Sequence, residues 1–269
     1  MDMDATATGE SRQTARSMPR VIQLWRFWLT LAWHDWRRRF RRSLLGAAWL
    51  FVSFGLFIAV KILIFGVLSA ESMAFFSVWL STGFLIWTFV QSNLVEGCNV
   101  FISSSRWIKA ADLPYGIYVL QSVTRSLIQL LLSGLVVVIV LFLFPPPDIW
   151  MALTSLLALP VLVVNGIWSQ ILLGTICARF RDVIHLTQTA TRLLFFLTPI
   201  LWVPESFGEY GRYADYNPFT HVLAIFRDPL IYGTFPVDSW LIVLAITIGG
   251  IALSAFTFTR NKHRIFYWV

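Results

Sequence analysis

The chain carries one concentrated group of side chains suited to binding phosphate, close to its N-terminus. Five arginines fall within six positions, directly before a long apolar stretch: Arg37, Arg38, Arg39, Arg41 and Arg42. A guanidinium group presents a planar fork of N–H donors that matches phosphate oxygens, so the cluster would suit the pyrophosphate of a lipid-linked substrate. Arginines beside an apolar stretch also set membrane topology and bind anionic lipid headgroups, a simpler role that we keep beside the first.

A second group of polar and aromatic residues lies inside the apolar stretches. Its members recur at helical spacing in two stripes: Trp49, Ser53, Phe57 and Lys61 in one, and His185, Gln188, Arg192 and Phe195 in the other. Such a stripe faces either a packed helix bundle or an aqueous conduit, and we favour the conduit. For Lys61 the alternative is snorkelling to the outer membrane interface. Arg125 is expected to pair with a carboxylate, for which Glu96 is the candidate.

Other kinds of chemistry are not indicated. The lysines at 61, 109 and 262 do not follow glycines, so the chain has no P-loop for a nucleotide. The four histidines lack zinc-protease spacing, and no paired aspartates are placed to hold a metal-bound sugar nucleotide. Cys98 and Cys177 fall at expected cytoplasmic helix ends, where neither a disulfide nor a metal site is expected. We therefore expect no catalytic residue and no metal site.

Composition indicates which kind of protein must position these residues. Hydrophobic residues make up 57% of the 269 positions and charged residues only 13%, as in an integral membrane protein. The net charge is +7, and the basic residues that produce it lie beside the apolar stretches. This distribution follows the positive-inside bias and does not indicate nucleic-acid binding. Residues 1–20 are polar without the apolar core of a signal peptide, and they predict a cytoplasmic tail.

Six apolar stretches are long enough to cross a bilayer, which takes about 20 residues. They are 43–69, 74–95, 116–144, 149–176, 183–203 and 238–259. An even number of spans places the N-terminus and the C-terminal segment 260–269 on the same side of the membrane. Of the 21 lysines and arginines, 16 fall in the segments that this topology places in the cytoplasm, and only Arg212 and Arg227 fall in outer loops. The sequence predicts an all-α, multi-pass membrane protein with both termini cytoplasmic.

Two further segments are expected to be helical without crossing the bilayer. Residues 21–42 combine tryptophans with arginines and predict an amphipathic helix on the cytoplasmic membrane face. The connection 204–237 holds four prolines, a run of aromatics and an apolar piece too short to span. We expect one or two short helices that re-enter the outer leaflet there, because irregular backbone at depth must be shielded by protein.

Four motifs occur in order along the chain. They are Asp35 with Arg39–Ser43, Leu45-Gly46 and Trp49; the loop 101–114 ending in Leu113-Pro114; Arg181-Asp182-Val183 leading to Phe196–Pro199; and Asn217-Pro218 with Arg227, followed by a terminal Tyr267-Trp268. In this order and topology they resemble the permease subunit of bacterial polysaccharide ABC exporters, which move O-antigen, capsule and teichoic acid chains. Phe40 stands where that family usually has tyrosine, and Phe54 where it commonly has proline.

The resemblance implies an assembly. Two copies of the permease domain 43–259 would form a central conduit, above two copies of a separate ATPase subunit that binds ATP and magnesium. This chain itself would bind no cofactor. The loop of about 98–113 would be the coupling helix that docks on the ATPase, and 204–237 would form the outer gate. The residues expected in these roles are Phe101, Arg106, Trp107 and Lys109 at the ATPase, and Tyr213, Tyr216, Asn217 and Arg227 at the gate.

The expected function is that of a transport permease, not an enzyme, which moves lipid-linked polysaccharide across the bacterial inner membrane. O-antigen is the first expected cargo. Aromatic side chains would offer flat faces to the sliding sugar rings, with Trp49, Phe57 and Trp87 as candidates. The alternatives are an exporter permease for capsule or teichoic acid, an ABC permease for a small lipid or drug, and a membrane enzyme of glycan assembly.

Overall fold

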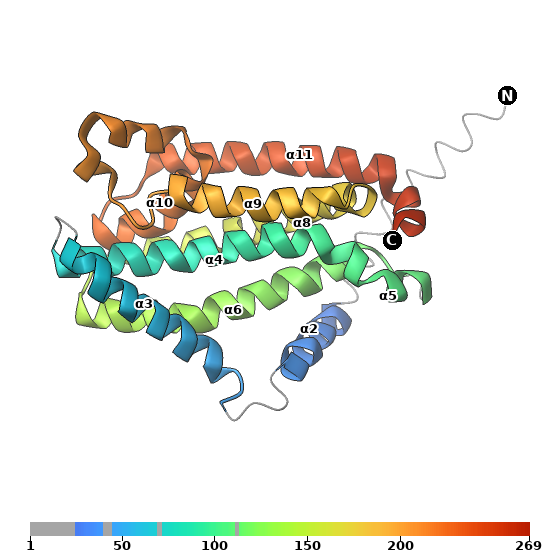
Figure 1. Cartoon of the computed structure of the whole chain (residues 1–269), viewed down its shortest axis with the longest axis horizontal. Helices are drawn as coiled ribbons and strands as arrows, with labels where there is room; N and C mark the ends of the chain where they lie inside the picture. Colours follow the sequence, from blue (N-terminus) through green and yellow to red (C-terminus); the bar gives the residue numbers. More distant parts are fainter. Residues whose placement is uncertain (1–24, 40–44, 69–71, 111–112) are drawn as a thin grey trace.

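The computed structural model describes residues 25–39, 45–68, 72–110 and 113–269, and every regular element within them is a helix. The elements are α2 (Trp25–Arg39), α3 (Ala48–Leu68), α4 (Met73–Ser103), α5 (Ser105–Ala110), α6 (Gly116–Leu143), α7 (Ile149–Thr154), η1 (Ser155–Leu157), α8 (Ala158–Arg179), α9 (Asp182–Leu197), η2 (Pro204–Tyr216), α10 (Pro218–Ile231) and α11 (Val237–Trp268). The long helices run roughly along one axis, with η2 and α10 at one end of the bundle and α5 at the other (Figure 1). The all-α membrane fold expected from the sequence is confirmed.

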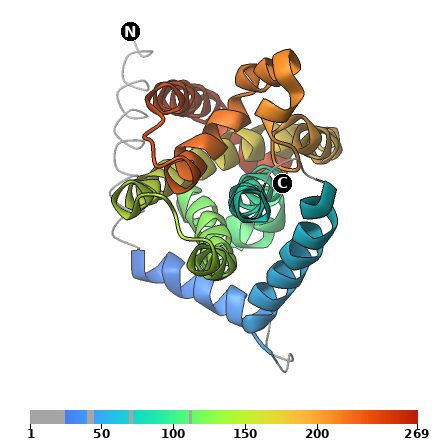
Figure 2. The ribbon, with the colours of Figure 1, turned by 90° about the vertical axis from the view of Figure 1, so that its left-hand side faces the viewer.

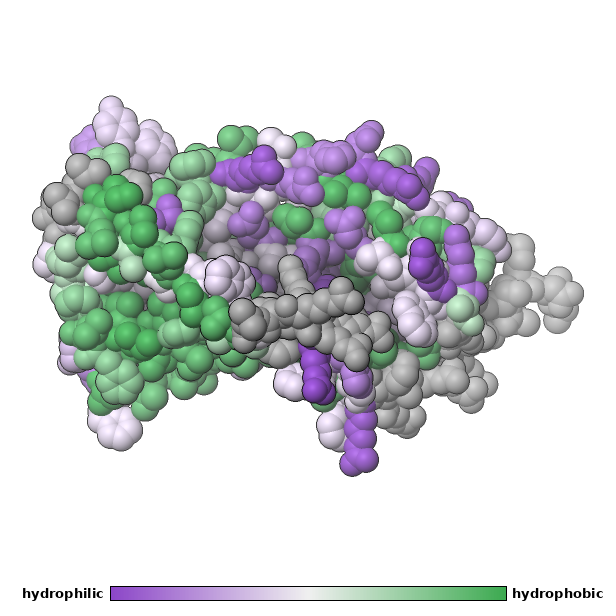
Figure 3. All heavy atoms as spheres, turned by 60° about the horizontal axis from the view of Figure 1, so that its bottom comes forward, coloured by the Kyte–Doolittle hydropathy of each residue, from purple (hydrophilic) through white to green (hydrophobic). Residues whose placement is uncertain are grey.

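Helix α4 lies at the centre of the bundle, as the end-on view shows (Figure 2). It packs against α3, α6, α8, α9 and α10. In its most apolar stretch 72% of the residues are buried, compared with 22–33% in the corresponding stretches of α6, α7–α8 and α11. The surrounding helices therefore keep apolar outer faces, which is what helices in lipid require. In Figure 3 a continuous apolar surface covers the left-hand part of the molecule, and hydrophilic residues are mixed with apolar ones over the right-hand part.

Four helical segments of the described chain are long and apolar enough to cross a membrane: Met73–Ala110, Gly116–Leu143, Ile149–Arg179 and Val237–Trp268. A shorter apolar helix, Ala48–Ile64, occupies most of the first expected span. The fourth expected span is interrupted by the 3₁₀ turn η1, just before Pro160. The fifth ends at Leu197, earlier than the expected residue 203, because Pro199 follows and a proline disfavours helix in the residue before it.

The C-terminal segment 260–269, expected as a cytoplasmic tail, is helical in the structure. Helix α11 continues without a break to Trp268. Ile265 is fully buried in an apolar cluster with Phe101 of α4 and Tyr118 of α6. The guanidinium of Arg179 lies 5.6 Å from the ring centroid of Trp268. Apolar side chains that the sequence pattern assigned to a tail thus extend the bundle at the end near α5.

Buried amide side chains and glycines hold the central helices close together. The side-chain amide of Gln170 on α8 donates to Asn93 Oδ1 on α4 at 2.8 Å, and Asn165 on α8 donates to Thr247 Oγ1 on α11 at 2.8 Å. Gly97 of α4 faces the backbone of Gln170 so closely that a Cβ atom there would lie 2.9 Å from the Gln170 Cα. Small residues at helix contacts and hydrogen bonds between helices are how membrane bundles associate.

An ion pair joins α4 to α6. Arg125 donates to Glu96 Oε2 from Nη2 at 2.8 Å and from Nε at 3.2 Å. The pairing of Arg125 with Glu96 expected from the sequence is confirmed.

Removing both members of this pair is expected to cost less stability than the sum of the costs of removing each one. Glu96→Ala leaves the guanidinium without its carboxylate, Arg125→Ala leaves the carboxylate alone, and the double variant leaves neither. Because both side chains are 31% exposed, we expect a coupling energy of only about 1 kcal/mol. Thermal unfolding of the parent, the two single variants and the double variant measures it, and additive single effects would contradict the pairing.

Candidate functional site

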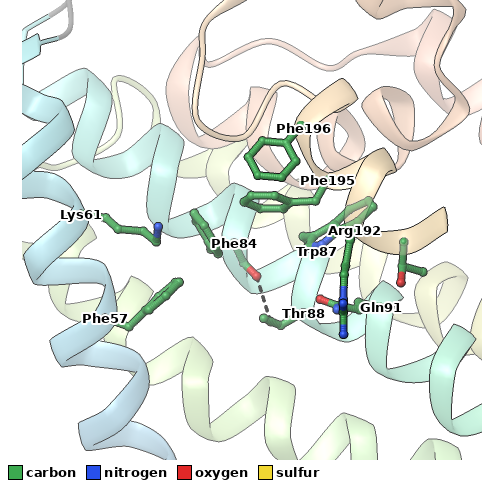
Figure 4. Close-up of a pocket in the computed structure, with 10 residues that line it drawn as sticks. Phe57, Lys61, Phe84, Trp87, Thr88, Gln91, Arg192, Phe195 and Phe196 are labelled. Carbon is green, nitrogen blue, oxygen red and sulfur yellow. Dashed lines mark hydrogen bonds between the residues drawn. The ribbon is translucent and has the colours of Figure 1, made fainter. Parts of the chain in front are cut away.

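A cavity of about 380 Å³ lies between α3, α4 and α9. Its lining comes from these three helices: Phe57 and Lys61 of α3; Phe84, Trp87, Thr88 and Gln91 of α4; and Thr191, Arg192, Phe195 and Phe196 of α9. The side chains converge from the three helices toward a common space (Figure 4). The volume falls within the range of sites for small organic groups, and the lining combines flat rings with a few polar groups.

The helical period of α4 places its four lining residues on one face of the helix. Phe84, Trp87, Thr88 and Gln91 follow one another at i, i+3, i+4 and i+7, which places them on one face. Phe84 and Trp87 are 5% and 2% exposed, so their rings are fixed by packing. The Thr88 hydroxyl donates to the Phe84 carbonyl oxygen at 2.8 Å (Figure 4). The α4 side of the cavity is therefore a rigid wall.

Aromatic rings form the apolar part of the lining. The Phe84 ring lies 5.0 Å from Phe57 and 5.2 Å from Phe195, measured between centroids. Trp87 lies 6.0 Å from Phe195, and Phe196 lies 5.2 Å from Phe195. These are edge-on and tilted arrangements, which aromatic pairs prefer. The result is an aromatic lining in which Phe84 and Trp87 are buried, whereas the Phe57 and Phe196 side chains are exposed.

Two cations complete the lining. The ammonium of Lys61 lies 4.6 Å from the ring centroid of Phe57 and 5.2 Å from that of Phe84, within the range of cation–π attraction. Arg192 extends from α9 toward Gln91 (Figure 4). Among the described residues that line the cavity, none is an aspartate or glutamate. The cavity is thus a positively charged, aromatic-walled space.

The end of the bundle beyond the cavity is closed by η2 and α10. Gly208 breaks η2 with a positive φ of 55°, a backbone conformation that favours glycine. A 3₁₀ helix has three residues per turn, so Tyr210, Tyr213 and Tyr216 lie in one row, with centroid distances of 6.4 and 6.5 Å. Asn217 caps α10, accepting from the Phe219 amide at 3.0 Å, and donates to Thr198 Oγ1 at 2.9 Å.

Arg227 of α10 is the one buried cation that the structure describes at this end. The residue is 3% exposed, and Nη1 donates to the carbonyl oxygen of Pro199 at 2.8 Å. Its guanidinium lies 3.3 Å from the ring centroid of Trp79 on α4, and Nε lies 3.8 Å from Asp228 Oδ1. Arg227 therefore joins three parts of the chain at one point: α10, α4, and the segment that follows α9.

A hydrogen bond between side chains links η2 to the end of α10. Tyr232 donates from its hydroxyl to Glu205 Oε1 at 3.1 Å. Burial, helped by the neighbouring Glu205 carboxylate, raises the pKa of the Tyr232 hydroxyl above its ordinary value. The hydroxyl therefore keeps its proton and remains a donor to Glu205 well above neutral pH.

Comparison with known proteins identifies the family. The family model described as ABC-2 type transporter matches residues 26–231, which is more than half of the chain. The chain belongs to this family. Two relatives from Klebsiella pneumoniae, each named O-antigen export system permease protein RfbA, are 26% and 24% identical over 86% of this chain and 90% of their own length. A relative of that name from Myxococcus xanthus is 21% identical over 65% of this chain and 67% of its own length.

Membership in the ABC-2 type family confirms several expectations from the sequence. The chain is a membrane-embedded transport permease and not an enzyme, and it resembles the O-antigen export permeases. ABC-2 type permeases work with an ATPase on a separate subunit, so the missing P-loop is accounted for. The match to the family model, residues 26–231, includes α3, α4 and α9 and therefore the residues that line the cavity.

The cavity of the ABC-2 permease brings together five of the nine residues expected to line a conduit. These five are Phe57, Lys61, Trp87, Arg192 and Phe195. The other four, Trp49, Ser53, His185 and Gln188, lie nearer the first residues of α3 and α9, outside the cavity. Sequence reasoning missed Phe84, Thr88, Gln91, Thr191 and Phe196. The spacing of Phe84, Thr88 and Gln91 relative to Trp87 was the available signal.

The arginine cluster is described only in part. Arg37 is exposed near the end of α2, which packs against α6. The side chains of Arg38 and Arg39, and positions 41 and 42 altogether, lie outside the described residues. Trp25 and Trp33 of α2 are half exposed, whereas Ala32 is buried. Helix α2 lies within the expected segment 21–42, and the amphipathic interface role of this segment and the phosphate-binding role of the cluster both stay predictions.

The expected ATPase-contacting residues divide into two groups. Arg106, Trp107 and Lys109 are exposed on α5, a short helix at the opposite end of the bundle from η2. Phe101 is not on that surface, because α4 stays helical to Ser103 and turns this side chain inward. It is fully buried, 5.5 Å from Tyr115 and 6.5 Å from Phe258 between ring centroids. We therefore correct Phe101 from a docking residue to a core residue.

Proposed function

We propose that the permease moves a lipid-linked polysaccharide, with O-antigen as the first candidate, across the bacterial inner membrane. The observation that carries this proposal is the cavity between α3, α4 and α9. Its aromatic walls offer weak, repeatable contacts to sugar rings, and Gln91, Thr88 and the two cations offer polar partners to sugar substituents. A sliding polymer needs contacts of this kind, because one tight site would stop its movement.

A second copy of the chain would complete the path. The cavity lies on the side of the bundle where α3 and α9 flank α4 (Figure 2). On this side α9 exposes His185 and Arg192, which lipid tails would not solvate. A homodimer that brings two such faces together would enclose both polar stripes around one central conduit. The charge bias of the sequence supports six spans per chain with both termini in the cytoplasm.

Other parts of the molecule would serve the two ends of this path. The arginines of 37–42 would receive the pyrophosphate at the cytoplasmic face, because guanidinium groups bind phosphate in a bidentate manner. Arg106, Trp107 and Lys109 on α5 would contact the two ATPase subunits, which bind ATP and magnesium. At the far end, η2 and α10 with Tyr213, Tyr216, Asn217 and Arg227 would form the outer gate, as helices that re-enter the outer leaflet.

Deleting the gene tests the proposed function. Surface polysaccharide and extracted lipid-linked glycan are compared in the parent, the deletion strain and a strain complemented with the intact gene. We expect surface polymer to disappear while lipid-linked polymer accumulates inside, since synthesis would continue without export. Complete absence of lipid-linked polymer would instead support an enzyme of glycan assembly. Unchanged levels of both would contradict a polysaccharide cargo and leave a small lipid or drug. The chemical identity of the accumulated polymer separates O-antigen from capsule and teichoic acid.

A further inference from the structure

Helix η2 presents three different rows of side chains after its break at Gly208, because a 3₁₀ helix repeats every three residues. The first row, Gly211 and Ala214, is buried, and Gly211 lies so close to the Pro204 carbonyl oxygen that a Cβ atom there would clash with it. The second row is charged and exposed, and it consists of Glu209, Arg212 and Asp215. The third, which we call the tyrosine row, consists of Tyr210, Tyr213 and Tyr216. The buried row fixes how the helix is turned, and the other two rows stay open.

The tyrosine row is more exposed than side chains that serve internal packing. Its three members are 75%, 68% and 83% exposed, in chain order. Single exposed aromatic residues are common on proteins, whereas a contiguous row of them marks a contact surface. From Tyr210 to Tyr216 the row extends about 12 Å, at roughly 2.0 Å per residue of a 3₁₀ helix. It is therefore long enough to contact more than one ring of a chain-like ligand.

The composition of η2 indicates which ligand the tyrosine row fits. A tyrosine offers a flat apolar ring together with a hydroxyl, a combination that matches the C–H faces and hydroxyl groups of sugars. The adjacent carboxylates of Glu209 and Asp215 can accept hydrogen bonds from sugar hydroxyls. Lipid is a poorer match, because its tails do not solvate these carboxylates. Three acidic residues of η2 against one arginine also disfavour anionic headgroups. Charge complementarity thus favours a neutral, hydroxyl-rich ligand.

Aromatic side chains also connect the cavity to η2. Phe196 lines the cavity, and its carbonyl oxygen accepts a hydrogen bond from Trp202 Nε1 at 3.1 Å. The Trp202 ring lies 5.2 Å from that of Phe207, between centroids, near the start of η2. The tyrosine row begins three residues later, beyond Gly208. A glycan that moves from the cavity toward η2 would thus meet aromatic side chains up to the tyrosine row.

Resting on the proposed function, we infer that the tyrosine row is a carbohydrate-binding site, which takes neutral sugar rings of the polymer at the η2 end of the bundle. This end lies opposite α5 (Figure 1). The role differs from that of a gate, since a gate closes the path and the tyrosine row holds polymer that has passed it. Each ring is mostly exposed, so each contact buries little surface and is weak. The polymer therefore remains free to slide.

A fluorine label inside the tyrosine row tests the inference. Tyr213→3-fluorotyrosine is introduced into the complex of permease and ATPase in phosphatidylcholine nanodiscs. Fluorine NMR then follows a titration with maltohexaose, a neutral oligosaccharide, and we expect a shift of the label that saturates with sugar concentration. Tyr267→3-fluorotyrosine, at the opposite end of the bundle, is the matched control, because Tyr267 is 83% exposed, as Tyr216 is. The signal of this control should not shift.

Variants of the two neighbouring tyrosines show whether the rings act together. Tyr210→Ser with Tyr216→Ser in the protein labelled at 213 should raise the half-saturating sugar concentration about tenfold, or about 1.4 kcal/mol shared between two rings. Tyr210→Phe with Tyr216→Phe keeps the rings and should stay close to the parent value. Size-exclusion chromatography with light scattering confirms that each variant complex keeps its composition.

A label at Tyr213 that does not respond to maltohexaose would overturn the inference, as would an equal response at Tyr267. Two other occupants of the tyrosine row have their own results. A response to phosphatidylglycerol in the nanodisc, without one to sugar, would assign the row to lipid headgroups. A change of oligomeric state in the serine variant would assign it to a second copy of the chain.

The gene deletion described above remains a separate test. If the label is unresponsive while the deletion strain loses surface polymer and accumulates lipid-linked polymer, only the carbohydrate-site inference is wrong. If the deletion strain keeps unchanged polymer, the proposed function is wrong, and the polymer is excluded as the ligand of the tyrosine row.

Discussion

Replacing Arg227 with alanine is expected to lower the thermal stability of the permease more than any other single truncation at the η2 end. The change removes the donor to the Pro199 carbonyl and the guanidinium that packs on Trp79, and it leaves Asp228 without its neighbouring cation. An unsatisfied buried acceptor together with lost packing costs about 3 kcal/mol. At about 2–4 °C per kcal/mol, the unfolding midpoint should fall by roughly 6–12 °C.

The midpoint is measured by heating detergent-solubilised protein and counting the fraction that remains monodisperse. Arg227→Lys should give an intermediate fall, because an ammonium cannot both donate to Pro199 and cover the Trp79 ring as a planar guanidinium does. Arg212→Ala, an exposed arginine of η2, is the matched control and should leave the midpoint unchanged. A midpoint for Arg227→Ala equal to that of this control would show that Arg227 does not hold the end of the bundle together.

A leucine at Gly250 is expected to separate α11 from α8, while a leucine at the preceding Gly249 is expected to be harmless. A Cβ atom at Gly250 would lie 2.4 to 2.7 Å from three atoms of the Trp168 ring, whereas at Gly249 nothing lies within 4 Å. The ring cannot easily move, because Trp168 Nε1 donates to Asn165 Oδ1 at 2.8 Å and Asn165 in turn bonds Thr247. Overpacking of this kind costs about 1–3 kcal/mol or more.

The comparison of Gly250→Leu with Gly249→Leu uses the yield of monodisperse protein and its unfolding midpoint. Both variants introduce a leucine at neighbouring positions of the same helix. A difference between their unfolding midpoints therefore reports the contact with Trp168. Adding Trp168→Ala to Gly250→Leu frees the space that the leucine needs and should recover part of the loss. Equal midpoints for the two single variants would contradict the close approach of α8 and α11.

Most helices were predictable because the apolar stretches are long and the charges lie between them. The pairing of Arg125 with Glu96 was also predictable, since two opposite charges on neighbouring apolar helices have few other partners. Helix ends were less accessible to sequence reasoning. Phe101 was placed on a docking loop through the resemblance to the exporter permeases, and a motif does not show which of its side chains turn inward. Phe101 packs against Tyr115 and Phe258, and α4 stays helical to Ser103.

The cavity was predictable on α3 and α9, where polar residues mark a helix face, but only in part on α4. On α9, His185, Gln188 and Arg192 stand out against apolar neighbours, and on α3 the same holds for Lys61. Helix α4 is buried along most of its apolar stretch, so its apolar residues do not mark one face. Only the spacing from Trp87 pointed to Phe84 and Thr88. The amide pair of Asn93 and Gln170 was missed for a related reason, because spacing within one helix does not reveal a partner on another.

The length of α9 has a consequence for the surrounding lipid. Its 16 residues extend about 24 Å at 1.5 Å per residue, whereas the hydrocarbon core of a bilayer is about 30 Å thick. In the proposed topology α9 is a spanning helix, and one this short, ended by the turn at Pro199, would produce hydrophobic mismatch, which a bilayer relieves by thinning locally. The lipid beside α9 would then be compressed toward η2 and α10. The thinnest part of the membrane would therefore lie next to the helix that contributes Arg192 and Phe195 to the cavity.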